Sequence, residues 1–379
     1  MLSRALGALL FLPAALRVVC AQSTSTTACN NSPSLCSRAY NNITYLGAHD
    51  SPFLRDAADD YDVSGNQYYN STVQLSAGVR LLSAQVQMTN STSSGQLHVC
   101  HTSCDLLDAG KLSDWLGEVN SWLVANPNEV VTVLLVNGAD ASAQDLATEY
   151  EEAGISTIAY TPTSTAASSA STTSGYAGST SASATSSDWP TLQSMINNGT
   201  RLVNFVADLS DNTAAPYLLN EFSYIFENSY ENTAPTDYSC VANRPSSVAN
   251  NTEQALSEGL MPLMNHFLYE QEAFDIQAPN DTYITTTNSP NPSGGVGNLG
   301  TSADECTSSY GKAPNFILVD FFNVGPAIQT IDRLNGVSNA VGRTNVSTSV
   351  MSATSGAGAA CIRVTMLCLT LLAAMLVVV

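Results

Sequence analysis

The sequence predicts an α/β fold, a TIM-type (β/α)8 barrel in either a regular or a distorted and incomplete form. Short apolar or β-branched runs alternate with helical patterns along most of the chain, which is the order expected of a parallel sheet with helices outside it. Removal of a leader and a tail leaves roughly 330 residues, a normal length for a closed α/β barrel.

Six runs have the composition of largely buried parallel strands. They are Ile43–His49, Val79–Gln87, Gln96–His101, Val130–Val136, Leu202–Val206 and Phe316–Phe322. Between the third and fourth runs, the apolar residues of Leu112–Leu123 recur at helical spacing and form one stripe. Residues 210–311 are less regular, because loops rich in Pro, Asn and Gly interrupt them.

The first residues have the pattern of a signal peptide. Arg4 precedes an apolar run from Ala5 to Ala15, and small residues lead up to Ala21. We therefore expect residues 1–21 to be removed on export. Because Arg17 interrupts the apolar region, an uncleaved anchor is the alternative.

The last residues have the pattern of a signal for a glycosylphosphatidylinositol (GPI) anchor. Small residues and a short spacer lead into a terminal apolar tail, so we expect residues 356–379 to be a propeptide and Ser355 the attachment residue, with Gly356 as the alternative. Residues 341–355 then form a Ser/Thr-rich stalk. A transmembrane helix is the other interpretation, but it needs about 20 apolar residues and usually a basic stop beyond them.

Glycosylation motifs agree with export to the cell surface. Eight Asn-X-Ser/Thr sequences are present, more than chance alone supplies. They begin at Asn30, Asn42, Asn70, Asn90, Asn198, Asn250, Asn280 and Asn345.

The cysteine count also fits an oxidising compartment. Of nine cysteines, Cys20 leaves with the leader, and Cys361 and Cys368 leave with the tail, so an even number remains. Cys29 with Cys36 and Cys100 with Cys104 are close enough to pair locally, which leaves Cys240 for Cys306. Other connectivities stay open at this stage.

Composition separates one segment from the predicted barrel, which we place at residues 22–340. Residues 161–187 are almost wholly Ser, Thr and Ala, a composition that cannot bury enough surface to fold. We expect a disordered loop inserted into one domain; a linker between two domains is the alternative.

The charge restricts the partners. The formal net charge is −20 with 12% charged residues, which excludes a basic nucleic-acid footprint. It also argues against electrostatic docking onto anionic lipid, so contact with the membrane falls to the GPI anchor. We expect a monomer.

Four residues at predicted strand ends could carry chemistry. His49, followed by Asp50, and His101 each close a predicted strand, and active sites of parallel barrels lie where strands end. Asp320 lies in an apolar late strand, where burial without a partner is costly, and a histidine is the natural partner. Two histidines and two carboxylates form a general acid/base set. Satisfied strand-end polar groups are the plainer interpretation.

Several motifs occur in the order of a known family. Leu46–Ser51 resembles the first catalytic motif of the phosphatidylinositol-specific phospholipase C (PI-PLC) X-domain family, and the fungal PLC-like phosphodiesterases are the closer match. The resemblance spans roughly residues 41–337. The other segments that carry it are Gly78–Leu82, Gln96–Cys104, Asn126–Val131, Trp189–Gln193 and Pro314–Asn323.

This resemblance implies a mechanism. His49 is the general base that removes a proton from a substrate hydroxyl, and Asp320 orients it. His101, supported by Asp50, protonates the departing alkoxide. A cyclic phosphate forms first, and water opens it with the two roles exchanged. The implied substrate is a phosphodiester, an inositol or glycerol phospholipid among them.

The second strand departs from the family pattern. The metal-independent relatives carry an Arg against the phosphate there and the calcium-dependent ones carry acidic ligands, whereas Ser83 and Gln85 take those places here. Neither supplies charge, and Arg80 alternates onto the opposite face of the strand. Calcium as a cofactor stays open. The alternative function is a catalytically weak barrel that serves as a surface binding or cell-wall glycoprotein.

Two further histidine features have competing interpretations. His98 and His101 with Cys100 and Cys104 have the spacing of a zinc site, but exported cysteines usually form disulfides. His266 could end another strand near the site, or could be a hydrogen-bonded core residue.

Overall fold

A computed structural model describes residues 27–58, 61–89, 95–162, 189–271 and 277–352 of the chain. Within these ranges, parallel strands form the main sheet in the order β7-β6-β5-β2-β1-β12-β9-β8. They are β1 (Tyr45–Ala48), β2 (Leu81–Met88), β5 (Val131–Asn137), β6 (Leu202–Ala207), β7 (Leu218–Asn220), β8 (Ile225–Glu227), β9 (Met261–Asn265) and β12 (Phe316–Val319).

The sheet is a barrel with one unpaired seam. Starting at β1, the strands follow one another around the sheet in chain order, and β12 pairs with β1 again in parallel. Among the described residues, every neighbouring pair in this circuit is hydrogen-bonded except the short strands β7 and β8. The predicted barrel is therefore confirmed in its incomplete form.

Side-chain alternation separates an inner core from an outer one. The inner cluster takes residues from all of these strands: Tyr45, Leu81, Leu134, Phe205, Leu219, Ile225, Leu263 and Phe316. Their strand neighbours Leu46, Leu82, Val133, Val206, Leu218, Phe226, Met264 and Ile317 belong to the cluster that packs under the helices. The inner cluster shows that the sheet closes around its own side chains.

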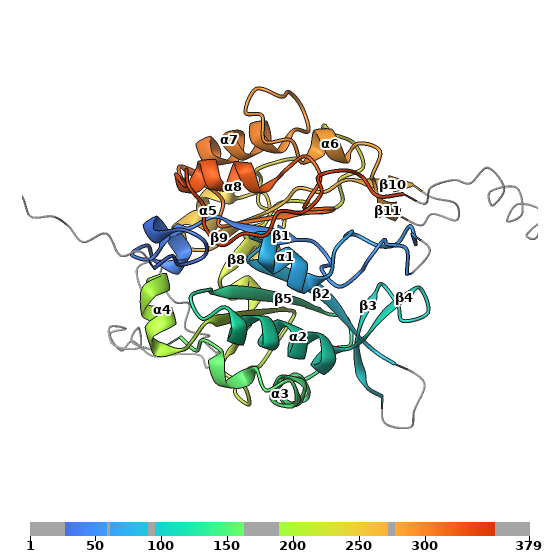
Figure 1. The fold of residues 1–379 in the computed structure, drawn as a ribbon, viewed down its shortest axis with the longest axis vertical. Helices are drawn as coiled ribbons and strands as arrows, with labels where there is room; N and C mark the ends of the chain where they lie inside the picture. Colours follow the sequence, from blue (N-terminus) through green and yellow to red (C-terminus); the bar gives the residue numbers. More distant parts are fainter. Residues whose placement is uncertain (1–26, 59–60, 90–94, 163–188, 272–276, 353–379) are drawn as a thin grey trace, which may run out of the picture.

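Helices cover the outside of the barrel (Figure 1). They are α1 (Ser71–Ala77), α2 (Leu112–Ala125), α3 (Ala143–Glu152), α4 (Leu192–Asn198), α5 (Thr252–Ser257), α6 (Ile284–Thr287), α7 (Leu299–Tyr310) and α8 (Ile328–Asn335). The stripe predicted over Leu112–Leu123 is confirmed, because α2 buries that face against the sheet.

One strand has a different place in the sheet from the one predicted. The run Gln96–His101 was expected among the parallel strands, but β3 (Leu97–His101) pairs antiparallel with the end of β2 and then with β4 (Leu107–Lys111). The hairpin projects beyond the barrel beside the end of β2 (Figure 1). A short apolar run has the same composition in either direction, so the sequence could not distinguish the two. A second hairpin pairs β10 (Tyr269–Gln271) with β11 (Gln277–Pro279).

Residues 341–352, which the sequence assigns to a stalk, have backbone contacts with the barrel. This segment lies along the barrel: the backbone N–H of Val341 donates to the carbonyl of Asn31 over 2.9 Å, and that of Thr344 donates to the carbonyl of Ser76 over 2.8 Å. Backbone groups that bond to the barrel hold the segment in place, which a solvated stalk would not do.

Several predictions fall outside the described residues. They concern the signal peptide, the GPI propeptide, Ser355, Asn90 and all but the first two residues of the Ser/Thr-rich insertion. Strands β5 and β6, which precede and follow that insertion, pair with each other over six residues. The insertion therefore interrupts one domain and does not join two. In the described residues, no helix has the length and apolar character needed to cross a membrane.

The three expected disulfides are present. Cys29 is bonded to Cys36, Cys100 to Cys104, and Cys240 to Cys306. The second bridge closes the turn that follows β3, and the third joins the loop after β8 to α7. This pairing settles the connectivity that the sequence left open.

The structure argues against a glycan on Asn30. This residue is 5% exposed, its amide nitrogen donates to the carbonyl of Val130 over 3.0 Å, and its amide oxygen accepts from the N–H of Val130 over 2.7 Å. A glycan on that nitrogen would have no room beside the strand. We therefore expect Asn30 to carry no glycan. The exposed candidates are Asn42, Asn70, Asn198, Asn250 and Asn345, with Asn280 partly exposed.

We expect peptide mass analysis of the secreted protein to find Asn30 unmodified. Asn30→Ala should lower the free energy of unfolding by about 1–3 kcal/mol, because it leaves both backbone groups of Val130 buried without a partner. Asn42→Ala, at an exposed site, is the control and should stay within about 0.5 kcal/mol of the parent in urea unfolding. A glycan found on Asn30 of folded protein would contradict this assignment.

Candidate active site

Polar side chains continue the inner face of the barrel beyond its apolar layer. They lie at or just after the carboxyl ends of the strands, where parallel barrels build their sites. In strand order they are His49, Ser83, Gln85, Glu227, Asn265 and Asp320. His49 and Asp320 therefore lie at the same end of the barrel.

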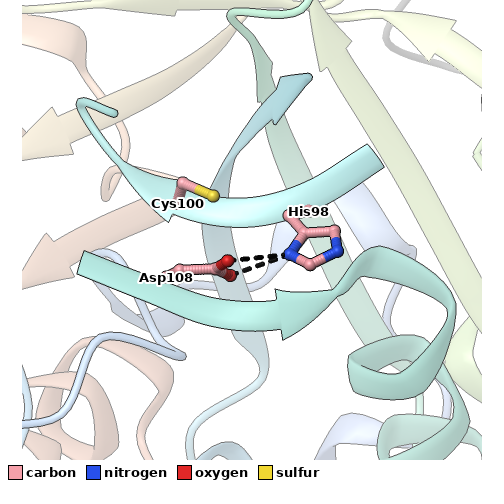
Figure 2. Close-up of side chains that lie close together, drawn as sticks. All are labelled: His98, Cys100 and Asp108. Carbon is pink, nitrogen blue, oxygen red and sulfur yellow. Dashed lines mark hydrogen bonds and ion pairs between the residues drawn. The ribbon is translucent and has the colours of Figure 1, made fainter. Parts of the chain in front are cut away.

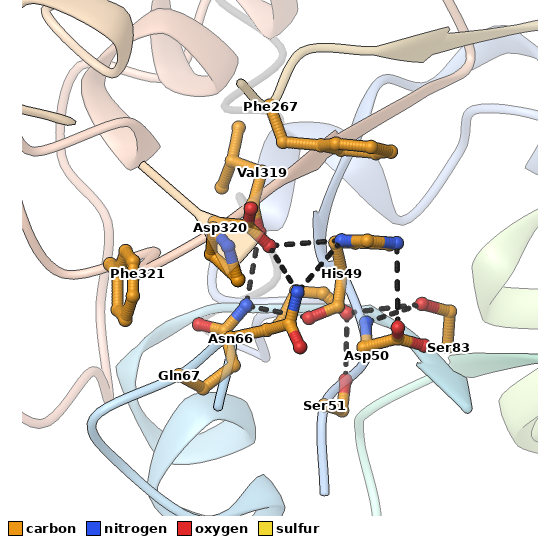
Figure 3. A network of polar contacts seen from close by, with 12 residues as sticks. His49, Asp50, Ser51, Asn66, Gln67, Ser83, Phe267, Val319, Asp320 and Phe321 are labelled. Atoms are coloured by element: carbon orange, nitrogen blue, oxygen red, sulfur yellow. Dashed lines mark hydrogen bonds and ion pairs between the residues drawn. The ribbon is translucent and has the colours of Figure 1, made fainter. Parts of the chain in front are cut away.

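Pairing of the first and last strands brings His49 to Asp320. Ala48 lies opposite Val319, and the backbone N–H of His49 donates to the carbonyl of Val319 over 2.9 Å. One residue further along each strand, His49 Nδ1 lies 2.9 Å from Asp320 Oδ1 (Figure 3). The carboxylate thus fixes the imidazole and directs its Nε2 away from Asp320.

Asp50 lies between the two histidines. Its Oδ2 is 3.6 Å from His49 Nε2 and 3.4 Å from His101 Nε2, and the residue is 2% exposed. The backbone turns sharply here, with φ +47°, and the N–H of Asp50 donates to Ser83 Oγ over 2.9 Å. A non-glycine residue in the left-handed region is uncommon and is held by its surroundings. This turn aims the carboxylate back at both imidazoles.

The β3–β4 hairpin supplies His101. Because β3 runs antiparallel to β2, its last residue returns over the mouth of the barrel instead of ending a barrel strand. The Cys100–Cys104 disulfide closes the turn around His101, and the edge of the imidazole packs against Phe53 with ring centres 5.2 Å apart. The predicted convergence of His101 with His49 is therefore observed, but by a different route through the fold.

Three neighbours of His49 were missed by the sequence analysis. Asn66 Nδ2 donates to Asp320 Oδ1 over 3.0 Å, Gln67 Nε2 donates to the carbonyl of His49 over 2.8 Å, and the Phe267 ring stacks on the imidazole at 3.8 Å (Figure 3). Asn66 and Gln67 lie in an irregular connection with no periodic pattern. Phe267 follows the end of β9, and this position after a strand could have indicated that it lies near the site.

The surroundings shift the pKa values of the two imidazoles in opposite directions. Burial favours the neutral form of His49, but the carboxylates of Asp50 and Asp320 outweigh it, and the pKa of His49 is raised. For His101, burial is also the largest effect, and the carboxylates of Asp50, Asp320 and Asp62 do not offset it, so the pKa of His101 is lowered. In the free protein, His49 therefore holds a proton to higher pH than His101 does. An anionic group bound beside His101 would raise its pKa and favour protonated His101.

Ser83 and Gln85 act on Asp50 and not on an open phosphate position. Ser83 Oγ accepts from the backbone of Asp50, while Gln85 Nε2 donates to Asp50 Oδ2 over 2.8 Å and Gln85 Oε1 accepts from the N–H of Thr102 over 2.9 Å. The role of these two residues at a phosphate or metal position stays a prediction. Both ends of the Gln85 amide are already engaged with protein groups.

Arg80 is remote from this site, as the alternation along the strand predicted. Its guanidinium is buried and donates to Glu129 over 2.9 Å. A different cation lies at the carboxyl end of β8: Arg244 forms an ion pair with the buried carboxylate of Glu227, and its guanidinium stacks over Tyr230 at 4.3 Å. Glu227 is also among the charges that raise the pKa of His49. No pattern in the sequence indicated this pair.

The zinc interpretation is wrong. In the described residues, the group with metal-like geometry is His98, Cys100 and Asp108, and Figure 2 shows that it lies on the two strands of the β3–β4 hairpin. Cys100 is bonded to Cys104 and cannot offer a thiolate, while His98 Nδ1 already bonds to Asp108 at 2.9 Å. Calcium fits poorly at the histidine pair as well, because it takes six to eight oxygen ligands and the nearby carboxylates already bond to imidazoles.

His266 is a core residue. It is fully buried, its Nε2 lies 2.9 Å from the carbonyl of Thr287, and its ring stacks on Tyr238. Burial lowers its pKa to about 4 from the ordinary value of 6.5. Of the two interpretations left open, the hydrogen-bonded core histidine is the one observed.

This burial makes stability depend on pH. The unfolded chain protonates His266 near its ordinary pKa of 6.5, but the folded chain does so only near a pKa of about 4, so stability is lost as pH falls between these values. We expect the free energy of unfolding in urea to fall less between pH 6.5 and pH 4.5 in His266→Gln than in the parent. Equal losses in both proteins would contradict a neutral buried His266.

We expect Asp320→Asn to lower the pKa of His49. The substitution keeps the shape of the side chain but removes one of the carboxylates that raise this pKa. A histidine NMR titration measures the shift directly, and Asp108→Asn, beside His98, is the matched control. An unchanged His49 titration would show that Asp320 does not govern the imidazole.

The chain is similar to a known family and to several known proteins. The PI-PLC X family model matches residues 35–335. A "PI-PLC X domain-containing protein 1" of the fungus Arthroderma benhamiae is 33% identical over 333 residues, which cover 88% of this chain and 96% of the relative. An "uncharacterized secreted protein" of the same fungus is 32% identical over 349 residues, covering 88% and 71%. A phosphatidylinositol-specific phospholipase C from Listeria monocytogenes is 14% identical, with a TM-score of 0.48 over 79% of this chain and 95% of that one.

Proposed function

The chain belongs to the PI-PLC X-domain family, and we propose that it is a phosphoric diester hydrolase in which His49 and His101 form the acid/base pair. The observation that carries the proposal is the convergence of both imidazoles on Asp50 while Asp320 fixes the other side of His49. A barrel held together only by its core does not need four titratable groups gathered at its mouth.

The proposed reaction has two steps. In the first, His49 Nε2 takes the proton of a substrate hydroxyl, the hydroxyl oxygen bonds to phosphorus, and the bond to the leaving alkoxide breaks as His101 protonates that oxygen. The product is a cyclic phosphodiester. In the second, water attacks phosphorus, His101 takes the proton of water, and His49 returns a proton to the ring oxygen that leaves.

The proposed substrates are inositol or glycerol phospholipids at a cell surface. The leader and the tail predicted from the sequence support a protein outside the cell, tethered by a GPI anchor at Ser355 to the plasma membrane or joined to the cell wall. One relative carries the word secreted in its name. The acidic charge of −20 leaves recognition to the headgroup and not to a general attraction for anionic lipid.

A second candidate function is binding without efficient turnover. Phosphoryl transfer depends on positive charge near the equatorial oxygens, and Gln85 supplies none on β2. If catalysis has been lost, the protein acts as a binding glycoprotein at the cell surface or in the cell wall.

Activity assays of the purified ectodomain, from Gln22 to Ser352, decide between the two. We expect hydrolysis of an inositol phosphodiester, with His49→Ala and His101→Ala each slower by about 100-fold or more, the range typical of lost acid/base groups. His98→Ala changes a histidine outside the site and is the matched control.

Each substrate is assayed with calcium and with a chelator. Equal rates in both would show that the chain's own residues suffice, whereas a calcium requirement would assign the missing charge to a metal. Folded protein that hydrolyses no member of a panel of inositol and glycerol phosphodiesters, with calcium or without it, would support the binding function instead.

A further inference from the structure

We infer that Gln85 is a positioning residue that sets the distance between Asp50 and His101. Its side chain spans the two parts of the site that no backbone ladder joins: Nε2 donates to Asp50 Oδ2 over 2.8 Å, and Oε1 accepts from the N–H of Thr102, the residue after His101, over 2.9 Å. The effect on catalysis rests on the proposed function, whereas the contacts of Gln85 do not depend on it.

The place of Gln85 on β2 explains why a side chain is needed there. The antiparallel ladder between β2 and β3 runs from Met88 and Leu97 to Val86 and Val99, and it ends there. Gln85 is the next residue of β2. Beyond Val99 the strand has no further ladder pairing with β2, although Cys100 and His101 still pair with β4. The bond from Thr102 to the Gln85 amide links the turn to β2 where that ladder stops.

The turn has a second reason to need this support. Thr102 has φ +61°, a left-handed conformation that a β-branched residue rarely adopts and that must be held by its surroundings. The Cys100–Cys104 disulfide restrains the ends of the turn, whereas the Gln85 amide holds its middle. The position of His101 thus depends on a bridge from within the turn and on a hydrogen bond from outside it.

Only a side-chain amide meets both requirements at this position. Asp50 presents a carboxylate and needs a donor, while Thr102 presents an N–H and needs an acceptor. A glutamate would set a second carboxylate against Asp50, and an arginine or lysine would have nothing to accept the N–H. The neutral residue found in place of a charged one therefore follows from the contacts that it makes.

The mechanistic effect acts through Asp50. Its Oδ2 is shared by Gln85 and His101, and the 3.4 Å separation between Oδ2 and His101 Nε2 is longer than a full hydrogen bond. A small movement of the carboxylate or of the turn would therefore decide whether His101 is supported as an acid. Displacements of about 1 Å in such groups cost about 100-fold in rate.

The first test does not require turnover. In a histidine NMR titration, Gln85→Glu should raise the pKa of His101, because a second carboxylate then lies beside Asp50 and favours the charged imidazole. Gln87→Glu places the same charge two residues further along β2 and should shift His101 much less. An unchanged His101 titration in Gln85→Glu, or equal shifts in both variants, would overturn the inference even if the protein hydrolyses no phosphodiester.

The second test uses rates on an inositol phosphodiester. Gln85→Met keeps the length of the side chain but makes neither bond, so kcat should fall about 10- to 100-fold with KM within about 2-fold. Gln85→Arg distinguishes positioning from phosphate contact: a lower rate fits positioning, and a rate above the parent's would show that the site lacks a phosphate-binding cation. Near-UV circular dichroism confirms that each variant is folded before it is assayed.

Discussion

The parallel pairing of β1 with β12 is the constraint on which the rest of the site depends. It joins the first strand of the barrel to the last, and the register that sets Ala48 opposite Val319 sets His49 beside Asp320. A shift of one residue would turn every side chain of the strand to the other face, so the register that fills the core also builds the ion pair. The pairing that joins the first strand to the last therefore also brings His49 to Asp320.

Asp50 connects the two histidines of the site. A buried carboxylate is costly unless polar groups surround it, and this one accepts from Gln85 and faces both imidazoles. Asp320 acts on both histidines but bonds directly only to His49, and the pKa values of the two imidazoles move apart. In the free protein this order is the reverse of the one that a neutral base at His49 and a protonated acid at His101 need, so the proposed roles require the bound substrate to change it.

The sequence predicted the barrel and the four titratable residues because each depends on a local pattern. His49 and Asp320 end apolar runs, and parallel strands bring such ends together whatever lies between them. The path of the β3–β4 hairpin could not be predicted, because a short apolar run does not reveal its direction. Asn66 and Gln67 were missed for a related reason: they act from an irregular connection. Gln85 was identified at the position that the family pattern marks, but its contacts were not predicted, since they depend on which groups meet the two ends of its amide.

The measurement that tests the central claim most directly is a double-mutant cycle on the two histidines. It compares the rates of the parent, His49→Ala, His101→Ala and the double variant on one inositol phosphodiester. If the imidazoles work as one set through Asp50, the double variant should be no more than about 10-fold slower than the slower single variant. Losses that multiply would show that the two histidines act independently and would contradict the shared site.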